Sequence, residues 1–245
     1  MKRFSMLYCR EFSFRVWQVW LLGLAALGSQ PLLFSFSELW SGRRFEQAYD
    51  GSGAPAAAVI LVGLAVGWMV YSTLRDFRGG IDTLLTLPAR RGWIYLAKMA
   101  AFASMLLVLW AGLLGGVFVS YGWYLLQIGR RLGPWPTVNG LLLAFCRSGV
   151  LRLFFPPDAA GIFSNLLMLM VLAVGSCYAG FSIVAKRVWR LIPLGIAGLC
   201  WVQVFRARLG NAVDSFPAPW WQLGLLAATV FLVVHSLWIV RKADF

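Results

Sequence analysis

Six long apolar segments follow one another along the chain, separated by segments that contain most of the Lys, Arg, Gly and Pro residues. A helix of about 20 apolar residues crosses a hydrocarbon core that is ~30 Å thick. By this criterion the pattern predicts membrane spans at residues 16–36, 56–74, 93–126, 161–184, 191–205 and 220–240. We therefore expect an all-α integral membrane protein with one transmembrane domain over residues 1–245.

Two of the six predicted spans have unusual lengths. The third has 34 residues, a helix about 50 Å long, so we expect it to overshoot the membrane or to bend near Gly115 and Gly116. The fifth has 15 residues and contains Pro193 and Gln203. Its outer half is therefore expected to be broken, or to continue as a re-entrant segment through Phe216.

The first residues of the chain have their own pattern. Apolar side chains recur at helical spacing between Lys and Arg residues, at Phe4, Leu7, Tyr8 and Phe12. This predicts an N-terminal amphipathic helix that lies at the membrane interface. The alternative is a disordered basic start that only sets the topology.

The distribution of basic residues predicts the orientation. Lys and Arg are denser in residues 1–15, 75–92, 185–190 and 241–245 than in the segments on the other side, and Lys and Arg are retained on the cytoplasmic side of short loops. Both termini are thus predicted to be cytoplasmic. Lys98 lies one turn inside the third span, and its long side chain is expected to reach back to the cytoplasmic interface.

Composition narrows the class of protein. Hydrophobic residues make up 60% of the 245 positions and charged residues 13%, a balance that one soluble core of this size cannot bury. The net charge of +13 comes from short basic clusters between spans, so it indicates topology rather than a nucleic-acid partner. The four cysteines are far apart and lack a CxxC pair, so we expect buried free thiols: Cys9, Cys146, Cys177 and Cys200.

Catalytic motifs are scarce. No lysine has the Gly before it and the Ser or Thr after it that a P-loop requires, and there is no HExxH motif and no pair of carboxylates in a span. If ATP hydrolysis powers this protein, we therefore expect another chain to bind the ATP. One enzymatic alternative is an intramembrane serine hydrolase with a dyad of Ser176 and His235, although the sequence reads Val-Gly-Ser-Cys around Ser176 where such enzymes have G-x-S-G.

The segment between the second and third spans has the most informative motif. It has a glycine pair, an acidic residue, two leucines, a proline and two arginines, followed by Ala-Lys. Here the sequence resembles the permeases of type-2 ABC exporters, which have Gly-x-x-Glu-x-Leu-Leu-x-x-Pro in this place. The residues that match, with Asp82 where Glu is usual, are Gly79, Gly80, Asp82, Leu84, Leu85, Pro88, Arg90, Arg91, Ala97 and Lys98.

Residues 172–189, a helix rich in small residues that runs into a basic turn, are weakly similar to the end of the fourth span of the same family. The long outer loop 127–160, with Arg147, Arg152 and two adjacent prolines, departs from the family pattern.

The resemblance implies a non-enzymatic permease subunit of an ATP-driven exporter in the bacterial inner membrane. It implies docking through residues 75–92, Gly79 to Arg91 above all, on a separate ABC ATPase subunit that binds ATP and Mg, and pairing with a second permease copy or a related permease. The apolar spans are compatible with peptides, hydrophobic drugs or lipid-linked cargo. Besides the hydrolase, a second alternative to the permease is a membrane sensor or scaffold that transports nothing.

Overall fold

The computed structural model describes residues 2–37, 44–79, 91–132, 138–184, 188–210 and 219–242. These residues are almost entirely helical and include no strand. Six helices among them are long and apolar enough to cross a membrane. They are α2 (Val16–Phe36), α4 (Ala54–Gly79), α6 (Arg91–Leu132), α9 (Ala159–Val184), α10 (Ile192–Gly210) and α11 (Pro219–Lys242). The predicted all-α, multi-pass architecture is confirmed.

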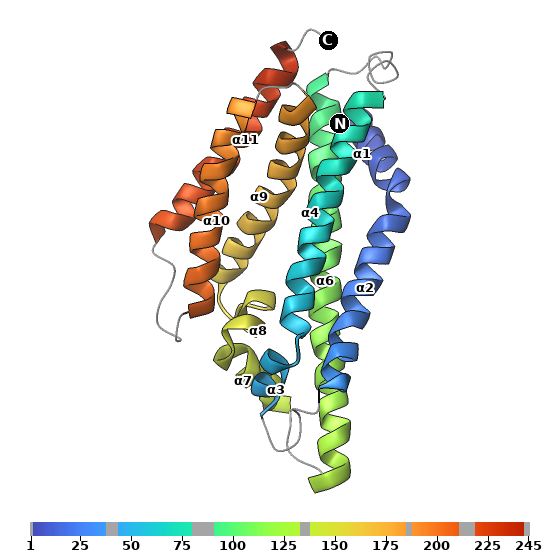
Figure 1. Cartoon of the computed structure of the whole chain (residues 1–245), viewed down its shortest axis with the longest axis vertical. Helices are drawn as coiled ribbons and strands as arrows, with labels where there is room; N and C mark the ends of the chain where they lie inside the picture. Colours follow the sequence, from blue (N-terminus) through green and yellow to red (C-terminus); the bar gives the residue numbers. More distant parts are fainter. Residues whose placement is uncertain are drawn as a thin grey trace.

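The six long helices form an antiparallel bundle (Figure 1). Helix α1 (Lys2–Phe14), the start of α6 and the last turns of α4 and α11 lie together at one end, which we call the α1 end. Three short helices, α3 (Phe45–Gly51), α7 (Val138–Arg147) and α8 (Gly149–Phe154), lie at the opposite α8 end. A 3-10 turn, η2 (Val188–Leu191), precedes α10.

Most predicted spans agree with the helices. The first coincides with α2, and the second, third, fourth and sixth lie within α4, α6, α9 and α11. Helix α6 runs for 42 residues through Gly115 and Gly116 without interruption, which is longer than a single crossing of the membrane requires. A Cβ atom at Gly116 would lie 2.7 Å from Cγ of Gln30, which shows that the glycine admits close packing of α2.

The prediction of a broken fifth span is wrong. Helix α10 continues to Gly210. Pro193 is its second residue, a position where a helix needs no backbone N–H donor, and Gln203 lies on its exposed side. The predicted re-entrant continuation to Phe216 falls on residues 211–218, which lie outside the described residues.

The segment 127–160 is not a simple loop. Helix α6 extends into it, and α7 and α8 follow, with Ala144, Phe145, Leu151 and Phe154 buried in the core. These helices pack on α3 and α10 because their apolar side chains find partners there.

The N-terminal segment is a helix rather than a disordered start. Tyr8 Oη and Ser104 Oγ of α6 form a hydrogen bond at 2.8 Å, and the rings of Phe4 and Trp93 lie 5.7 Å apart. Phe12 packs against the main apolar core. Helix α1 is therefore attached along the first turns of α6.

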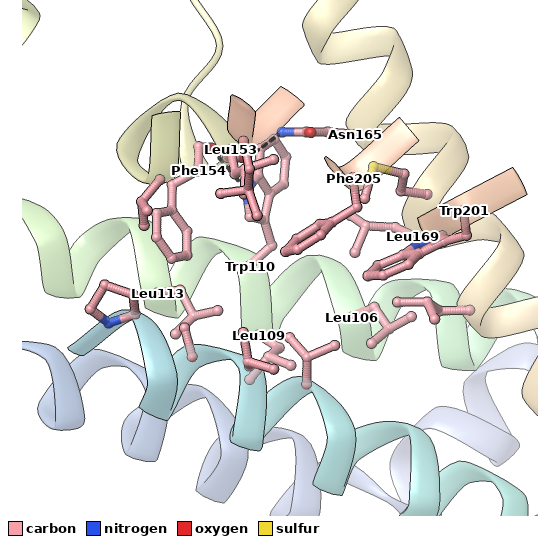
Figure 2. Close-up of a pocket in the computed structure, with 18 of the residues that line it drawn as sticks. Leu106, Leu109, Trp110, Leu113, Leu153, Phe154, Asn165, Leu169, Trp201 and Phe205 are labelled. Carbon is pink, nitrogen blue, oxygen red and sulfur yellow. Dashed lines mark hydrogen bonds between the residues drawn. The ribbon is translucent and has the colours of Figure 1, made fainter. Parts of the chain in front are cut away.

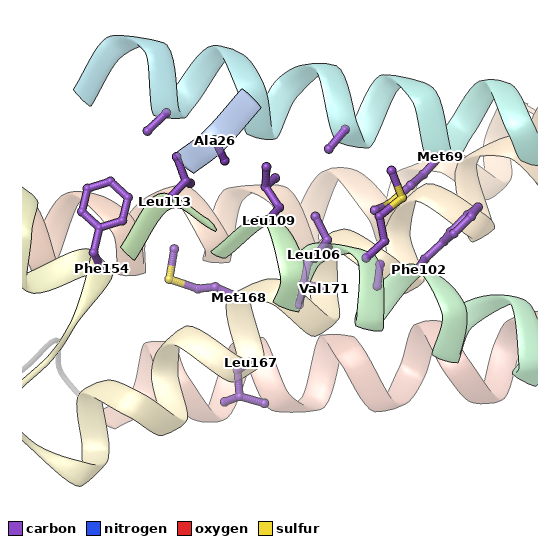
Figure 3. Close-up of a cluster of buried hydrophobic side chains, with 14 of the residues drawn as sticks. Ala26, Met69, Phe102, Leu106, Leu109, Leu113, Phe154, Leu167, Met168 and Val171 are labelled. Carbon is purple, nitrogen blue, oxygen red and sulfur yellow. The ribbon is translucent and has the colours of Figure 1, made fainter. Parts of the chain in front are cut away.

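Helix α9 is the most buried of the long helices. Figure 3 shows how Met168 and Val171 of α9 meet side chains of α6 in the centre of the bundle, whereas Leu167 points to the opposite side of α9. Small residues allow the close approach: a Cβ atom at Gly180 would lie 2.6 Å from Cβ of Thr73 on α4. The small-residue stretch that begins at residue 172 thus packs the centre of the fold.

Candidate functional site

A group of five charged and polar side chains joins three helices at the α1 end. Oδ2 of Asp76, in the last turn of the α4 span, accepts a hydrogen bond from Nη2 of Arg15 at 2.6 Å. The same oxygen accepts from Nζ of Lys98 on α6. Arg15, between α1 and α2, also donates through Nη1 to Glu11 Oε2 at 2.5 Å. With Ser72, these residues form what we call the Asp76 cluster.

The cations of the Asp76 cluster are withdrawn from solvent. Arg15 is 5% exposed and Lys98 is 4% exposed. Ser72 Oγ accepts hydrogen bonds from Nε and Nη2 of Arg15 at 3.1 and 2.9 Å, and the guanidinium lies 5.6 Å from the centre of the Phe102 ring. Two carboxylates balance two cations. Pairing and hydrogen bonding of this kind offset the cost of burying the charges.

The prediction that Lys98 reaches back to the cytoplasmic interface stays a prediction. Its ammonium group is buried and is paired with the Asp76 carboxylate in the last turn of the α4 span. The roles of Arg15, Glu11 and Asp76 were not predicted. The available signal is an acidic residue at the end of one span, followed by a lysine one turn inside the next.

Most of the predicted docking residues lie outside the described residues, and only the two at the ends of the motif are described. Gly79 ends α4 and Arg91 begins α6. Between them, Gly80, Asp82, Leu84, Leu85, Pro88 and Arg90 fall in residues 80–90, which the structure does not describe. Asp76 precedes this segment by one turn of α4, and Lys98 follows it by two turns of α6. The Asp76 cluster therefore fixes the helices on both flanks of the segment.

The structure does not bring Ser176 and His235 together as a dyad. Ser176 Oγ donates to the Ala173 carbonyl at 2.9 Å and contacts the sulfur of Met69 at 3.7 Å. Nδ1 of His235 shares a hydrogen bond with Tyr178 Oη at 2.9 Å. A serine that bonds the backbone of its own helix is a packing residue, and no base activates it.

An apolar groove of about 460 Å³ opens between α4, α6, α8, α9 and α10. In Figure 2 the rings of Trp201 and Phe205 on α10 lie opposite Leu106 and Leu109 on α6. The stacked rings are 5.1 Å apart. Nearly all the side chains that line the groove are apolar; Asn165 of α9 is its one amide.

A second buried arginine lies at the α8 end of this groove. Arg208 of α10 is 6% exposed, and its Nη1 donates to the Gly161 carbonyl at 3.0 Å and to Oδ1 of Asn165. Its Nη2 donates to the Arg152 carbonyl at 3.2 Å. Among the residues that the structure describes, no carboxylate lies within ion-pair distance of Arg208. We call Arg152, Gly161, Asn165 and Arg208 the Arg208 cluster.

The short helices at the α8 end have a polar contact of their own. Ser148 Oγ donates to Asp50 at 2.9 Å and accepts from the Leu151 backbone N–H at 3.2 Å, which caps α8. Burial raises the pKa of the Asp50 carboxyl, against the opposing effect of the Ser148 hydrogen bond. This contact attaches the end of α3 to α8.

Only part of the cysteine prediction is correct. All four cysteines are free, and Cys177 is buried, but Cys9 on α1 and Cys146 on α7 are exposed and Cys200 is partly buried. Within the described ranges, no group of three His, Cys, Asp or Glu side chains could hold a metal ion.

No protein-family model, curated protein or solved structure matches this chain. The functional argument therefore rests on the geometry and on the motif between α4 and α6.

Proposed function

We propose that this chain is the membrane-spanning permease subunit of an ATP-driven exporter in the bacterial inner membrane. Both termini and residues 75–92 are cytoplasmic in this proposal, so the α1 end faces the cytoplasm. A separate ABC ATPase subunit binds ATP and Mg and docks on residues 79–91, and a second permease, identical or related, completes the pathway. The exported substrate is an apolar or amphipathic molecule such as a peptide, a hydrophobic drug or lipid-linked cargo.

The Asp76 cluster is the observation that carries the proposal. It connects α1, α4 and α6 through ion pairs at the base of the segment that resembles the docking loop. A force applied to that segment is transmitted to three helices at once, because buried ion pairs resist separation.

The proposed mechanism is rigid-body motion of packed helices. Closure of two ATPase subunits on ATP draws their docking loops together, and the helices that hold these loops rock between two discrete arrangements. Asp76 and Arg15 keep α1 and α4 in register during the motion. The chain itself transfers no phosphate and needs no nucleotide site.

Substitution of Asp82 tests the proposed docking. Asp82→Lys reverses a charge that is expected to meet a basic residue of the ATPase subunit, so the ATPase should no longer co-purify with the permease and export should stop. Asp82→Glu is the matched control, since Glu is usual in the resembling family, and it should behave as wild type. Both variants should insert normally, because residue 82 lies between spans.

Three results would contradict the proposal in different ways. Full ATPase co-purification and export with Asp82→Lys would show that this segment does not couple the two chains. Co-purification without ATP-dependent export by the wild-type pair would favour the sensor or scaffold alternative. Labelling of Ser176 by a fluorophosphonate in the native chain would favour the hydrolase alternative.

A further inference from the structure

The groove is open toward the medium around the bundle. Val59, on α4, lines it and is 63% exposed, and Ala56, one turn earlier on the same helix, is also exposed. The helices that form it, α4, α6, α9 and α10, are long and apolar enough to span a membrane. A groove of about 460 Å³ is in the range of ~300–1,000 Å³ typical of ligand sites. In a bilayer the groove is suited to a hydrocarbon chain, because water molecules in an apolar space have no hydrogen-bond partners.

A buried positive charge lies directly behind the lining at one end of the groove. Asn165 and Leu209 line it there, and Arg208 is bonded to Asn165 and precedes Leu209 in the chain. A guanidinium has five N–H groups, and Arg208 uses three of them on the Gly161 carbonyl, the Arg152 carbonyl and Asn165. All three acceptors are neutral groups. The nearest described carboxylate that acts on the cation is Asp158, which attracts it from beyond ion-pair distance. Arg208 is thus hydrogen-bonded to neutral groups and only partly compensated by the described residues.

We infer that the groove binds one acyl chain of an anionic phospholipid of the surrounding bilayer, with the acidic headgroup at the Arg208 cluster. The apolar walls accept the chain, with the stacked rings of Trp201 and Phe205 along one side (Figure 2). The headgroup supplies the direct ion pair that Arg208 lacks among the described residues, where Asp158 lies beyond ion-pair distance. Arginine suits this role because it binds phosphate oxygens through paired N–H donors.

Charge complementarity distinguishes this occupant from a neutral lipid or a second protein chain. A neutral lipid would fill the apolar part and leave Arg208 only partly compensated in a medium of low dielectric constant, where an unpaired charge is costly. A second copy would have to bring an acidic side chain into the same end of the groove. The inference goes beyond the proposed function and does not depend on export or on an ATPase partner.

The test is lipid retention by the purified full-length chain. The chain in detergent is mixed with equal amounts of phosphatidylglycerol and phosphatidylcholine that have the same acyl chains, and native mass spectrometry counts the lipid that stays bound. The wild type should retain phosphatidylglycerol about tenfold over phosphatidylcholine, as one added charge-assisted contact predicts.

Two pairs of variants locate the site. Val59→Trp fills the groove and should abolish retention, whereas Ile60→Trp, on the next residue of α4, 62% exposed and outside the lining, should retain lipid as wild type does. Arg208→Gln should keep a bound chain but lose the tenfold preference. Arg206→Gln, an exposed position on the same helix, should keep that preference.

Three outcomes would overturn the inference. Equal retention of both lipids by the wild type would remove the acidic headgroup from the site. Unchanged retention by Val59→Trp would put the lipid elsewhere. Loss of a dimer in Val59→Trp, with lipid retention unchanged, would assign the groove to a second copy. The first two results need no substitution in the bundle core, so misfolding of Arg208→Gln cannot obscure them.

Discussion

Two buried arginines at opposite ends of the bundle are stabilised in different ways. Arg15 at the α1 end lies between two carboxylates, Glu11 and Asp76, and a second cation, Lys98, shares one of them. Arg208 at the α8 end donates to two carbonyls and to the Asn165 amide. Within the described residues the first cation is paired directly with carboxylates, whereas the second has only neutral hydrogen-bond acceptors and a more distant carboxylate, Asp158.

This difference indicates different roles. A neutralised cluster adds cross-links between helices and leaves no net charge for a ligand, which agrees with the transmission of force that we propose for the α1 end. A cation that is hydrogen-bonded but not neutralised keeps an electrostatic preference for an anion. The α8 end is therefore the part of the molecule that is suited to bind one. The following predictions test this contrast in order of expected effect.

Labelling of the two exposed cysteines should differ completely if the ends face opposite sides of the membrane. In intact cells that express single-cysteine variants of the protein, an impermeant maleimide should modify Cys146 on α7. Cys9 on α1 should react only after the cells are permeabilised. Mass spectrometry of the labelled peptides measures both. Reaction of Cys9 from outside would invert the proposed topology. Ser72→Cys would not report the side, since Ser72 is buried and bonded to Arg15.

Removal of the shared carboxylate should cause the largest loss of stability. Asp76→Asn leaves Arg15 and Lys98 buried without their common counter-ion, which costs about 3 kcal/mol in a buried pair. For a chain of this size, that loss lowers the apparent unfolding temperature in detergent by about 6–12 °C. Arg75→Gln is the control. Arg75 directly precedes Asp76 and is exposed, so this variant should unfold at nearly the wild-type temperature. A stable Asp76→Asn variant would show that the ion pairs are not structural.

Arg208→Gln should destabilise the chain less than Asp76→Asn. It removes three hydrogen bonds but also removes a buried charge, so a net cost of about 2 kcal/mol is expected. The apparent unfolding temperature is compared with that of Arg206→Gln in lipid-free detergent. A loss as large as that of Asp76→Asn would mean that an acidic group compensates Arg208 and would remove the contrast between the two ends.

Loosening the contact between α2 and α6, two helices that connect the α1 end to the α8 end, should have the smallest effect on stability. A Cβ atom at Gly112 would lie 2.6 Å from the carbonyl oxygen of Gly23, so Gly112→Ala should force the helices apart at a cost of about 1 kcal/mol. Gly122→Ala is the matched control, because its Cβ meets nothing within 4 Å and the alanine should be neutral or slightly stabilising. Equal unfolding temperatures would contradict this account of the glycines.

The spans could be predicted because a membrane helix must satisfy its own backbone, so local hydrophobicity decides where it runs. This explains why α2 agrees residue for residue with residues 16–36. The prediction for α10 failed because Pro193 was treated as a helix breaker, although a proline in the first turn is compatible with a helix.

The candidate site was less predictable because its contacts join residues far apart in the chain. Lys98 could be placed near the end of a span, but its pairing with Asp76 depends on how α4 meets α6. Helices α7 and α8 were missed because each is shorter than a span and is stabilised by tertiary packing, with Phe154 and Leu151 inserted into the core. The motif at residues 79–91 was the most informative signal that concerned function.

The Asp76 cluster also has a consequence for the order in which the protein is made. Arg15 leaves the ribosome 61 residues before Asp76, an interval of ~3–12 s at ~5–20 residues per second. During that time α2 enters the membrane with an arginine immediately before its first residue. Glu11, four residues earlier in the last turn of α1, is already present and can neutralise it. Asp76 arrives with α4 and binds Arg15, and Lys98 then completes the cluster when α6 is inserted. The sequential arrival of alternating charges lets each buried ion find a partner before the next helix covers it.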